Sequence, residues 1–248
     1  RRREKAIQLY EGYALWRDAF GLPIAMQIGR QDFDDYREWI FDDQLDAIRL
    51  HAYPLYPVIV EAAYINSLDN SANNKFRTLA DYLVYAHGRV MPSAEVGFWR
   101  LWRTDAEVTR KREPIWTGLR YRGRHGPIRP WLDVARLRGE DKGRRFRSHA
   151  VDVGSTVVHR IGDDGVSFTA GYAYAGGNTD QPKRTRVDRR FVQTGYEDNT
   201  GMFDGVATFQ YYGEIVDPEL SNLDIVTVGV GYRSGRTLSA DIIYHRYR

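Results

Sequence analysis

Apolar and polar residues alternate with a period of two along much of this sequence, and the periodicity of an amphipathic helix is scarce. Residues 115–121, 166–174, 224–232 and 237–245 carry mainly apolar or aromatic side chains at every second position, with small or charged residues between them. Successive side chains of a β-strand point to opposite faces, so such strands meet apolar material on one side only. The pattern therefore predicts an all-β, antiparallel chain.

The alternating runs are numerous enough to fill the chain with strands. Over 248 residues we predict about 12 to 13 strands, roughly 20 residues for each strand with its connection, which is close to the spacing of a transmembrane β-barrel. The predicted strands lie near 6–18, 22–31, 45–53, 57–66, 76–87, 94–104, 114–124, 128–138, 146–159, 165–175, 205–215, 223–233 and 237–248.

Long polar connections and short turns alternate between these strands. The long ones are predicted at 32–44, 67–75, 105–113, 139–145 and 176–204, while Gly162-Asp163-Asp164-Gly165 has the sequence of a tight hairpin. An up-and-down meander with long loops at one end and short turns at the other is typical of outer-membrane barrels. The joint at 234–236 does not fit, because it is short where the alternation requires a long connection.

The fold depends on what covers the apolar faces. The mean hydropathy of −0.55 and the lack of any apolar run near 18 residues exclude spanning helices, but a barrel strand needs only about 9–11 alternating residues. A soluble β domain that binds or cleaves carbohydrate fits the same pattern. Aromatic residues near strand ends favour the barrel, since they would form girdles at both membrane interfaces. These are Tyr10, Tyr13, Trp16, Tyr53, Tyr56, Trp99, Trp102, Tyr211, Tyr212, Tyr232 and Tyr244.

Basic residues are concentrated in residues 100–147, which hold 15 basic and six acidic side chains. Alternation places Arg120, Arg122 and Arg124 on one face of their strand. If the other face meets lipid, these arginines face a lumen that favours anions, and carboxylated sugars in particular. Alternatively, these arginines pair with acidic residues of the loops or lie on a face exposed to water. The same parity places these residues on lumen faces: Arg49, Glu61, Asp81, Asp133, Asp152, Glu214 and Asp241.

Residues 32–46 are strongly acidic, with seven carboxylates and a single arginine. A solvated loop is the simplest interpretation, and a glycosidase acid–base pair or a calcium loop would use the same residue types. A third interpretation is a gate, because a negative loop can fold onto a positive pore. The candidate gating residues are Asp32, Asp34, Asp35, Arg37, Glu38, Asp42 and Asp43. The six histidines do not have metal-ligand spacing, the chain has no Cys, and no catalytic motif is present, so we expect no metal, no cofactor and no enzyme activity.

Four stretches of the sequence resemble the alginate-export outer-membrane porin family. They are Gly29-Arg30-Gln31 continuing through Tyr36-Arg37-Glu38-Trp39 to Leu45-Asp46-Ala47-Ile48-Arg49-Leu50; Phe191-Val192-Gln193-Thr194-Gly195 with Asn199-Thr200-Gly201; Tyr211-Tyr212-Gly213-Glu214 with the polar run 217–223; and Tyr244-His245-Arg246-Tyr247-Arg248. The resemblance implies a monomeric barrel of about eighteen strands in the outer membrane of a Gram-negative bacterium. It also implies an electropositive pore that passes a polyuronate such as alginate, with a loop and a periplasmic turn able to obstruct it. By position in the first motif, Arg30 joins the predicted pore-lining residues.

Taken together, these observations predict a passive porin that exports an anionic polysaccharide. A general anion or small-molecule porin on the same scaffold remains the main alternative. The expected partners are the polysaccharide, outer-membrane lipid or lipopolysaccharide, and periplasmic proteins of an export complex. The alternation weighs against nucleic acid as a partner. Residues 1–248 are expected to form one partial barrel domain, truncated at both ends.

Overall fold

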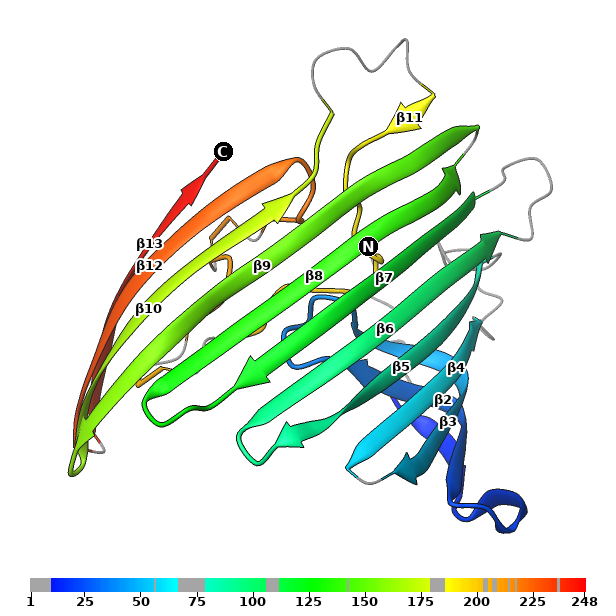
Figure 1. Cartoon of the computed structure of the whole chain (residues 1–248), viewed down its shortest axis with the longest axis horizontal. Coiled ribbons are helices and arrows are strands. Elements are labelled where there is room, and N and C mark those ends of the chain that lie inside the picture. The colour runs from blue at the N-terminus through cyan, green and yellow to red at the C-terminus, as the bar shows by residue number, and fades with distance from the viewer. Residues whose placement is uncertain are drawn as a thin grey trace, which may run out of the picture.

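The chain folds as one antiparallel sheet whose strands follow one another in sequence order, as the alternation predicts (Figure 1). The computed structural model describes residues 10–55, 57–66, 79–105, 112–141, 143–178, 186–202, 205–206, 209–213, 215–216, 218–235 and 237–248. The elements are β1 (Gly12–Trp16), a 3-10 turn (Ala19–Gly21), β2 (Ile24–Asp34), β3 (Asp42–Leu55), β4 (Val58–Asn66), β5 (Leu79–Met91), β6 (Ala94–Asp105), β7 (Arg112–Gly123), β8 (Ile128–Asp141), β9 (Arg144–Ile161), β10 (Asp164–Ala175), β11 (Val187–Asp188), β12 (Leu223–Ser234) and β13 (Leu238–Tyr247).

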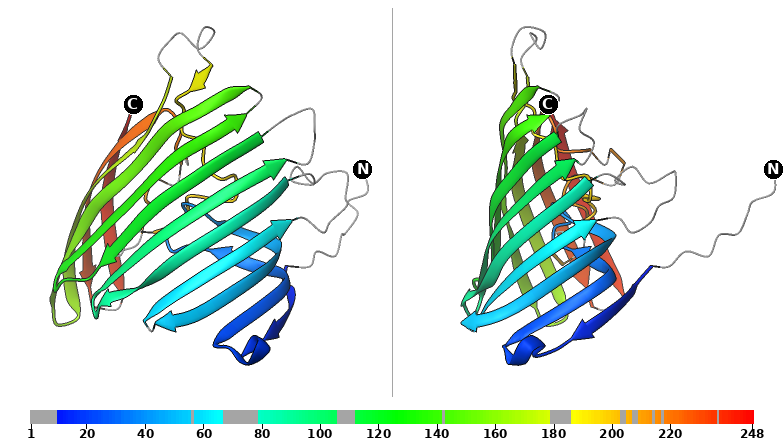
Figure 2. Two further views of the ribbon diagram at one scale, coloured as in Figure 1. Left: turned by 45° about the vertical axis from the view of Figure 1, so that its right-hand side comes forward. Right: turned by 90° about the vertical axis from the view of Figure 1, so that its right-hand side faces the viewer.

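The sheet curves around the long connections instead of packing on a second sheet (Figure 2). Its order runs from β1 to β13, and no pairing joins these two edges among the described residues. β11 is the exception to the order, since its two residues pair in parallel with β9. A soluble sandwich would need two stacked layers, so this alternative is wrong. Within the described residues, no helix is long and apolar enough to cross a membrane.

The two faces of the wall differ as the alternation predicts. On β10, Phe168 is 51% exposed on the outer face while the adjacent Thr169 is 1% exposed on the inner face. β12 repeats the pattern, with Val230 exposed and Thr227 buried. The outer surface is therefore an apolar belt without protein to cover it, which is the surface that a lipid-facing barrel wall presents.

One predicted connection and one predicted strand are wrong. Residues 139–145 are not a long loop, because β8 continues to Asp141 and pairs there with Arg144 at the start of β9. The paired ends of β8 and β9 carry charged residues and extend beyond the apolar belt of the outer face. Conversely, 205–215 is not a strand: among its described residues Val206, Phe209, Tyr211 and Tyr212 are all buried, which a strand with one apolar face cannot achieve.

The second correction explains the short joint at residues 234–236. Residues 176–222 form one long connection between β10 and β12, so the short joint before β13 falls where a short turn is due. The long connections between the described strands thus leave one end of the wall, the long-loop end, where the tight turn between β8 and β9 also lies. The other tight turns lie at the opposite end, the short-turn end (Figure 1). The acidic loop is also shorter than predicted, since β2 reaches Asp34 and pairs with Asp42 of β3.

Candidate functional site

Two connections fold back onto the inner face of the wall and pack on each other (Figure 2). The first is the loop of residues 35–41, and the second is the segment of residues 191–213. Trp39 stacks on Phe191 with ring centroids 6.2 Å apart, and Phe41 stacks on Tyr196 at 5.8 Å. The Thr194 hydroxyl donates to the Ile40 carbonyl at 2.5 Å. Together they form an internal plug, a name we keep for residues 35–41, 191–202, 205–206 and 209–213.

Asp35 sets the shape of the first plug loop. Its Oδ2 accepts hydrogen bonds from the backbone N–H groups of Ile40 at 2.6 Å and Phe41 at 3.1 Å. Its Oδ1 accepts from the N–H of Arg37 at 3.1 Å. An aspartate that binds backbone amides ahead of it in this way closes a compact turn. The turn directs the Arg37 side chain toward the wall.

Arg37 is the centre of a buried charge network between the plug and the wall. Its Nη2 lies 2.5 Å from Oδ2 of Asp152 on β9, and its Nη1 lies 3.7 Å from Oδ2 of Asp133 on β8. The two aspartates are directly paired across these strands. The guanidinium carbon lies 3.2 Å from the centroid of the Tyr211 ring, and the Tyr212 hydroxyl donates to Asp152. The second plug segment therefore covers the same ion pairs.

The electrostatics of Arg37 explain why the buried cation is tolerated. Burial alone would lower the pKa of the Arg37 guanidinium, but the Asp152 carboxylate, followed by Tyr211, Tyr212 and Asp133, raises that pKa above its ordinary value. A buried charge is stable only when it is paired and hydrogen-bonded. Arg37 meets this condition only while the plug is seated.

Arg120 ties the same network to the start of the plug loop. From β7, its Nε lies 2.5 Å from Oδ1 of Asp133, and its Nη1 lies 2.7 Å from Oδ1 of Asp35. Asp133 thus lies between Arg120 and Arg37. We call Arg37, Arg120, Asp133 and Asp152 the plug anchor. Asp35 connects the plug anchor with the turn that it shapes.

Other charges on the inner wall are paired in the same manner. On β6 and β5, Arg103 binds both oxygens of Asp81, with the shortest contact at 2.6 Å. On β3 and β4, Arg49 binds Glu61 through Nε at 3.0 Å and Nη2 at 2.6 Å. These pairs neutralise the wall beside the plug, and Trp116 adds a hydrogen bond to the Val192 carbonyl at 2.8 Å.

A cavity of about 330 Å³ lies at the short-turn end, between the wall and the plug. We call it the vestibule. Its charged lining consists of four arginines and one carboxylate, namely Arg89, Arg122, Arg124, Arg129 and Glu95. Tyr36 and Tyr211 of the plug complete the lining together with Trp131. The Arg122 guanidinium lies 3.5 Å from the centroid of the Tyr36 ring, so its charge is held beside the plug without a buried carboxylate.

The predicted lumen residues occupy different surroundings. Arg49, Asp81, Arg120, Asp133 and Asp152 lie on the inner face in the pairs described above. Arg122 and Arg124 line the vestibule, although Arg124 belongs to the turn after β7 and not to the strand. Asp241 is opposite Gly231 on the inner side of the edge strand β13. Glu214 lies outside the described residues.

Arg30 is placed on the outer face, which contradicts its predicted lumen position. It pairs in register with Asp46, 3.8 Å away, while the neighbouring inner positions are Gln31 and Leu45. The prediction for Arg30 follows from its place in a motif. Alternation along β2 instead places Arg30 on the same face as Ile28, which is exposed and is paired with the exposed Ile48 of β3.

The predicted gating residues divide into strand and loop positions. Asp32 and Asp34 belong to β2, and Asp42 and Asp43 belong to β3. The loop itself contributes Asp35, Arg37 and Glu38. The Glu38 carboxylate accepts a hydrogen bond from Thr200, and its backbone carbonyl accepts one from Asn199 at 3.2 Å. The loop therefore contacts the second plug segment through backbone, carboxylate and aromatic groups.

Sequence reasoning misses two vestibule arginines. Arg89 lies beyond the predicted end of its strand at residue 87, since β5 extends to Met91. Arg129 shares the parity of Trp131 and Asp133 on β8, and that signal is sufficient to place it on the inner face. Among the described residues, no group of three or more His, Asp or Glu side chains could hold a metal ion.

Comparisons with known proteins identify the family of this chain. A family model described as alginate export matches residues 3–248. The crystal structure of OccAB4 from Acinetobacter baumannii is similar over 91% of this chain and 67% of that chain, with 9% identity and a TM-score of 0.41. The outer membrane protein opdK from Pseudomonas aeruginosa is similar over 91% of this chain and 71% of that chain, with 14% identity and a TM-score of 0.41. A comparison with curated proteins finds no match. On the family match over nearly its whole length, this chain belongs to the alginate export family of outer-membrane porins.

Proposed function

We propose that this porin exports an anionic polysaccharide, alginate or a similar polyuronate, by passive passage through the lumen. The observation that carries the proposal is the vestibule, whose charged lining has four arginines and a single glutamate. Short turns of outer-membrane barrels face the periplasm, so this cavity is the first part of the lumen that an exported polymer meets.

The chemistry of the vestibule suits a chain of carboxylates. Arg122 is exposed to the cavity, and a guanidinium can bind a carboxylate through two parallel hydrogen bonds. Several arginines around one cavity offer repeated contacts instead of one tight site. Repeated weak contacts let a polyanion advance from one cation to the next.

The plug is the proposed gate. With the plug seated, its described residues occupy the lumen beyond the vestibule and are held by the plug anchor. A polymer can pass only if these segments move. Because Arg37 and Arg120 already bind carboxylates of the protein itself, they hold the plug and leave the exposed vestibule arginines to bind the polymer.

Current through single channels in planar bilayers tests the proposal. Polyuronate added at the short-turn side of the full-length protein should block the current at concentrations at least about tenfold below those of a neutral dextran of equal size. Equal block by dextran and polyuronate would show that size alone matters and would favour a general small-molecule porin. The absence of any block by polyuronate would contradict the proposal.

A further inference from the structure

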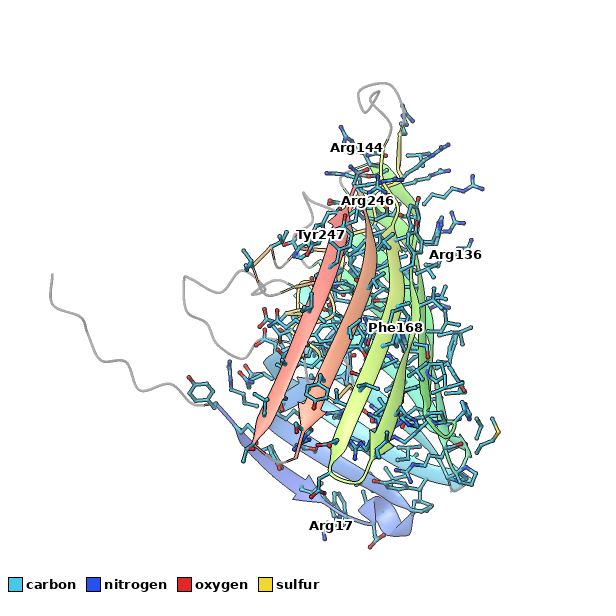
Figure 3. All side chains as sticks on the ribbon, turned by 90° about the vertical axis from the view of Figure 1, so that its left-hand side faces the viewer. Arg17, Arg136, Arg144, Phe168, Arg246 and Tyr247 are labelled. Carbon is cyan, nitrogen blue, oxygen red and sulfur yellow. The ribbon has the colours of Figure 1, made fainter. Side chains whose placement is uncertain are left out.

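A compact group of basic side chains lies on the outer face of the wall, away from the lumen and the plug. Arg136 and Arg138 project from the outer side of β8, and Arg147 and His149 from the outer side of β9. Arg136 is directly opposite His149, and Arg138 is directly opposite Arg147. Figure 3 shows Arg136 on the outer surface, nearer the long-loop end than Phe168.

The four side chains form a two-by-two arrangement with dimensions set by the sheet. Neighbours across the strands are about 5 Å apart, and neighbours along a strand are about 7 Å apart. Like charges directly opposite each other destabilise a sheet. Arg136, Arg138 and Arg147 form no ion pair with a described residue, and Arg138 Nε is buried without a hydrogen-bond partner. The arrangement therefore has unused donors and an electrostatic cost that a bound anion would remove.

On the described outer faces of β7, β8 and β9, the carboxylates lie in the next row toward the long-loop end. Glu140 on β8 is opposite Arg145 on β9 and Glu113 on β7. These acidic residues thus lie in the row of the outermost arginine, and the two rows below keep a net positive charge.

The surface below this group is apolar. Continuing along the same face away from the long-loop end, Val134 is opposite Val151 and Leu132 is opposite Val153. These four side chains belong to the belt that faces lipid. A molecule that fits both parts must carry anionic groups above and hydrocarbon chains below.

Neighbouring strands show that the group lies at the level of lipid head groups. The outer aromatic residues Tyr64, Tyr82 and Trp102 pair in register across β4, β5 and β6, and the same row continues through Ile115 to Arg138 and Arg147. Aromatic girdles mark the membrane interface. Figure 1 shows β8 and β9 reaching farther toward the long-loop end than β6, so the arginines lie at or just above the girdle.

We propose that Arg136, Arg138, Arg147 and His149 bind the phosphorylated head group of an outer-leaflet glycolipid. The long-loop end faces the cell exterior in outer-membrane barrels, so the lipid belongs to the outer leaflet. Phosphate groups bind between the two pairs of basic side chains, and the acyl chains lie on Val134, Val151, Leu132 and Val153. This site requires the membrane placement of the wall, but it does not depend on which substrate crosses the lumen.

Lipid binding to the detergent-solubilised full-length protein tests the site. Bisphosphorylated lipid A should bind in native mass spectrometry, and the Arg136→Gln/Arg138→Gln/Arg147→Gln variant should bind it about 100-fold more weakly, at roughly fivefold for each arginine. Lipid A without phosphates should not bind the unsubstituted protein at the same concentration. Binding of the dephosphorylated lipid, or equally tight binding of phosphatidylglycerol, would overturn the assignment.

Arg100 provides the matched control. It is an exposed outer-face arginine on β6, and its cross-strand neighbours are the uncharged Val84 and Thr117. Arg100→Gln should keep lipid A binding within about twofold, whereas a loss as large as that of the triple variant would show diffuse charge attraction instead of a site. The triple variant should also keep the polyuronate block of the channel, which separates the two proposals.

Discussion

The lumen contains two groups of arginines in opposite environments. In the plug anchor, Arg37 and Arg120 are buried, and each is within hydrogen-bond distance of a wall aspartate. In the vestibule, Arg89, Arg122 and Arg124 are exposed around a cavity that holds one carboxylate. Arg120 and Arg122 are two residues apart on the same face of β7, yet they belong to different groups.

The difference shows that position on the lumen face does not define the role of an arginine. A buried guanidinium loses several kcal/mol of hydration and recovers it only from its fixed partners, so the plug anchor holds structure in place. An exposed guanidinium keeps its water and can exchange it for a passing carboxylate. The first group should therefore control opening, and the second should control affinity for the polymer.

The largest effect is expected when the plug anchor is broken. Arg37→Ala leaves Asp133 and Asp152 buried without their shared cation, which costs about 3–5 kcal/mol for a buried pair. The plug should detach, the open-channel current should rise, and amides of residues 35–41 should exchange hydrogen faster.

The matched variant is Arg37→Met with Asp152→Asn. It removes both charges and should restore part of the protection of residues 35–41 against hydrogen exchange. If Arg37→Ala left both the current and the exchange rates unchanged, Arg37 would not hold the plug.

Vestibule substitutions should act on affinity and leave the plug in place. Arg122→Gln combined with Arg129→Gln removes two cations at a cost of about 1 kcal/mol each, so polyuronate should block at roughly 30-fold higher concentration. The current without polymer should change little.

Arg160→Gln is the control for this pair. Arg160 lines a separate cavity at the same end of the wall, beside Asp163 and Asp164. The block should be nearly unchanged in this variant. An equal loss of polyuronate block in Arg160→Gln and in the double vestibule variant would mean that the net charge of the protein, and not the vestibule, sets the affinity for the polymer.

Charge reversal in the vestibule should alter ion selectivity more modestly. Arg122→Glu replaces an exposed cation with an anion beside Glu95 and should lower the anion-to-cation permeability ratio roughly twofold. Reversal potentials in a salt gradient measure this ratio. A ratio equal to that of the unsubstituted protein would place Arg122 outside the ion path.

The smallest effect is expected from pH. Burial raises the pKa of the Glu197 carboxyl above its ordinary value of 4.5, although hydrogen bonds from Thr194 and the Gly195 amide oppose the shift. A raised pKa means that the seated plug favours the protonated acid, so its stability is lost as pH rises through the folded-state pKa.

Opening frequency should therefore increase from pH 4.5 upward, and Glu197→Gln should flatten this dependence. Single-channel recording over a pH series measures the slope. The same slope in Glu197→Gln would assign the titration to another group.

The wall is largely predictable because every residue of a barrel strand carries the same two-sided signal. Val166, Phe168 and Val230 are identified by alternation alone, and the structure confirms the all-β sheet that they predict. The signal fails where strands extend beyond the belt, as at 139–145, since charged residues there remain in register without an apolar face. It also fails at 205–215, where Val206, Phe209, Tyr211 and Tyr212 are all buried although the segment is not a wall strand.

The plug anchor is not predictable from alternation, because its partners are far apart in the sequence. Parity places Arg120 and Asp152 on the inner face, but nothing local indicates that Arg37, 115 residues before Asp152, lies between them. The stretches that resemble the family include Tyr36-Arg37-Glu38-Trp39, Phe191 to Gly195 and Tyr211-Tyr212, which all belong to the plug or contact it. Other parts of the same stretches, Gly29 to Gln31, Leu45 to Leu50 and Tyr244 to Tyr247, lie on the wall strands β2, β3 and β13, so the family resemblance covers both the inserted segments and the wall.

A structure of the full-length protein with a bound oligouronate tests the division of the arginines most directly. Our account predicts carboxylates of the oligomer against Arg122 and Arg129, with Arg37 still on Asp152 and Arg120 still on Asp133. An oligomer whose carboxylates replace these aspartates at Arg37 and Arg120, while the vestibule stays empty, would contradict it.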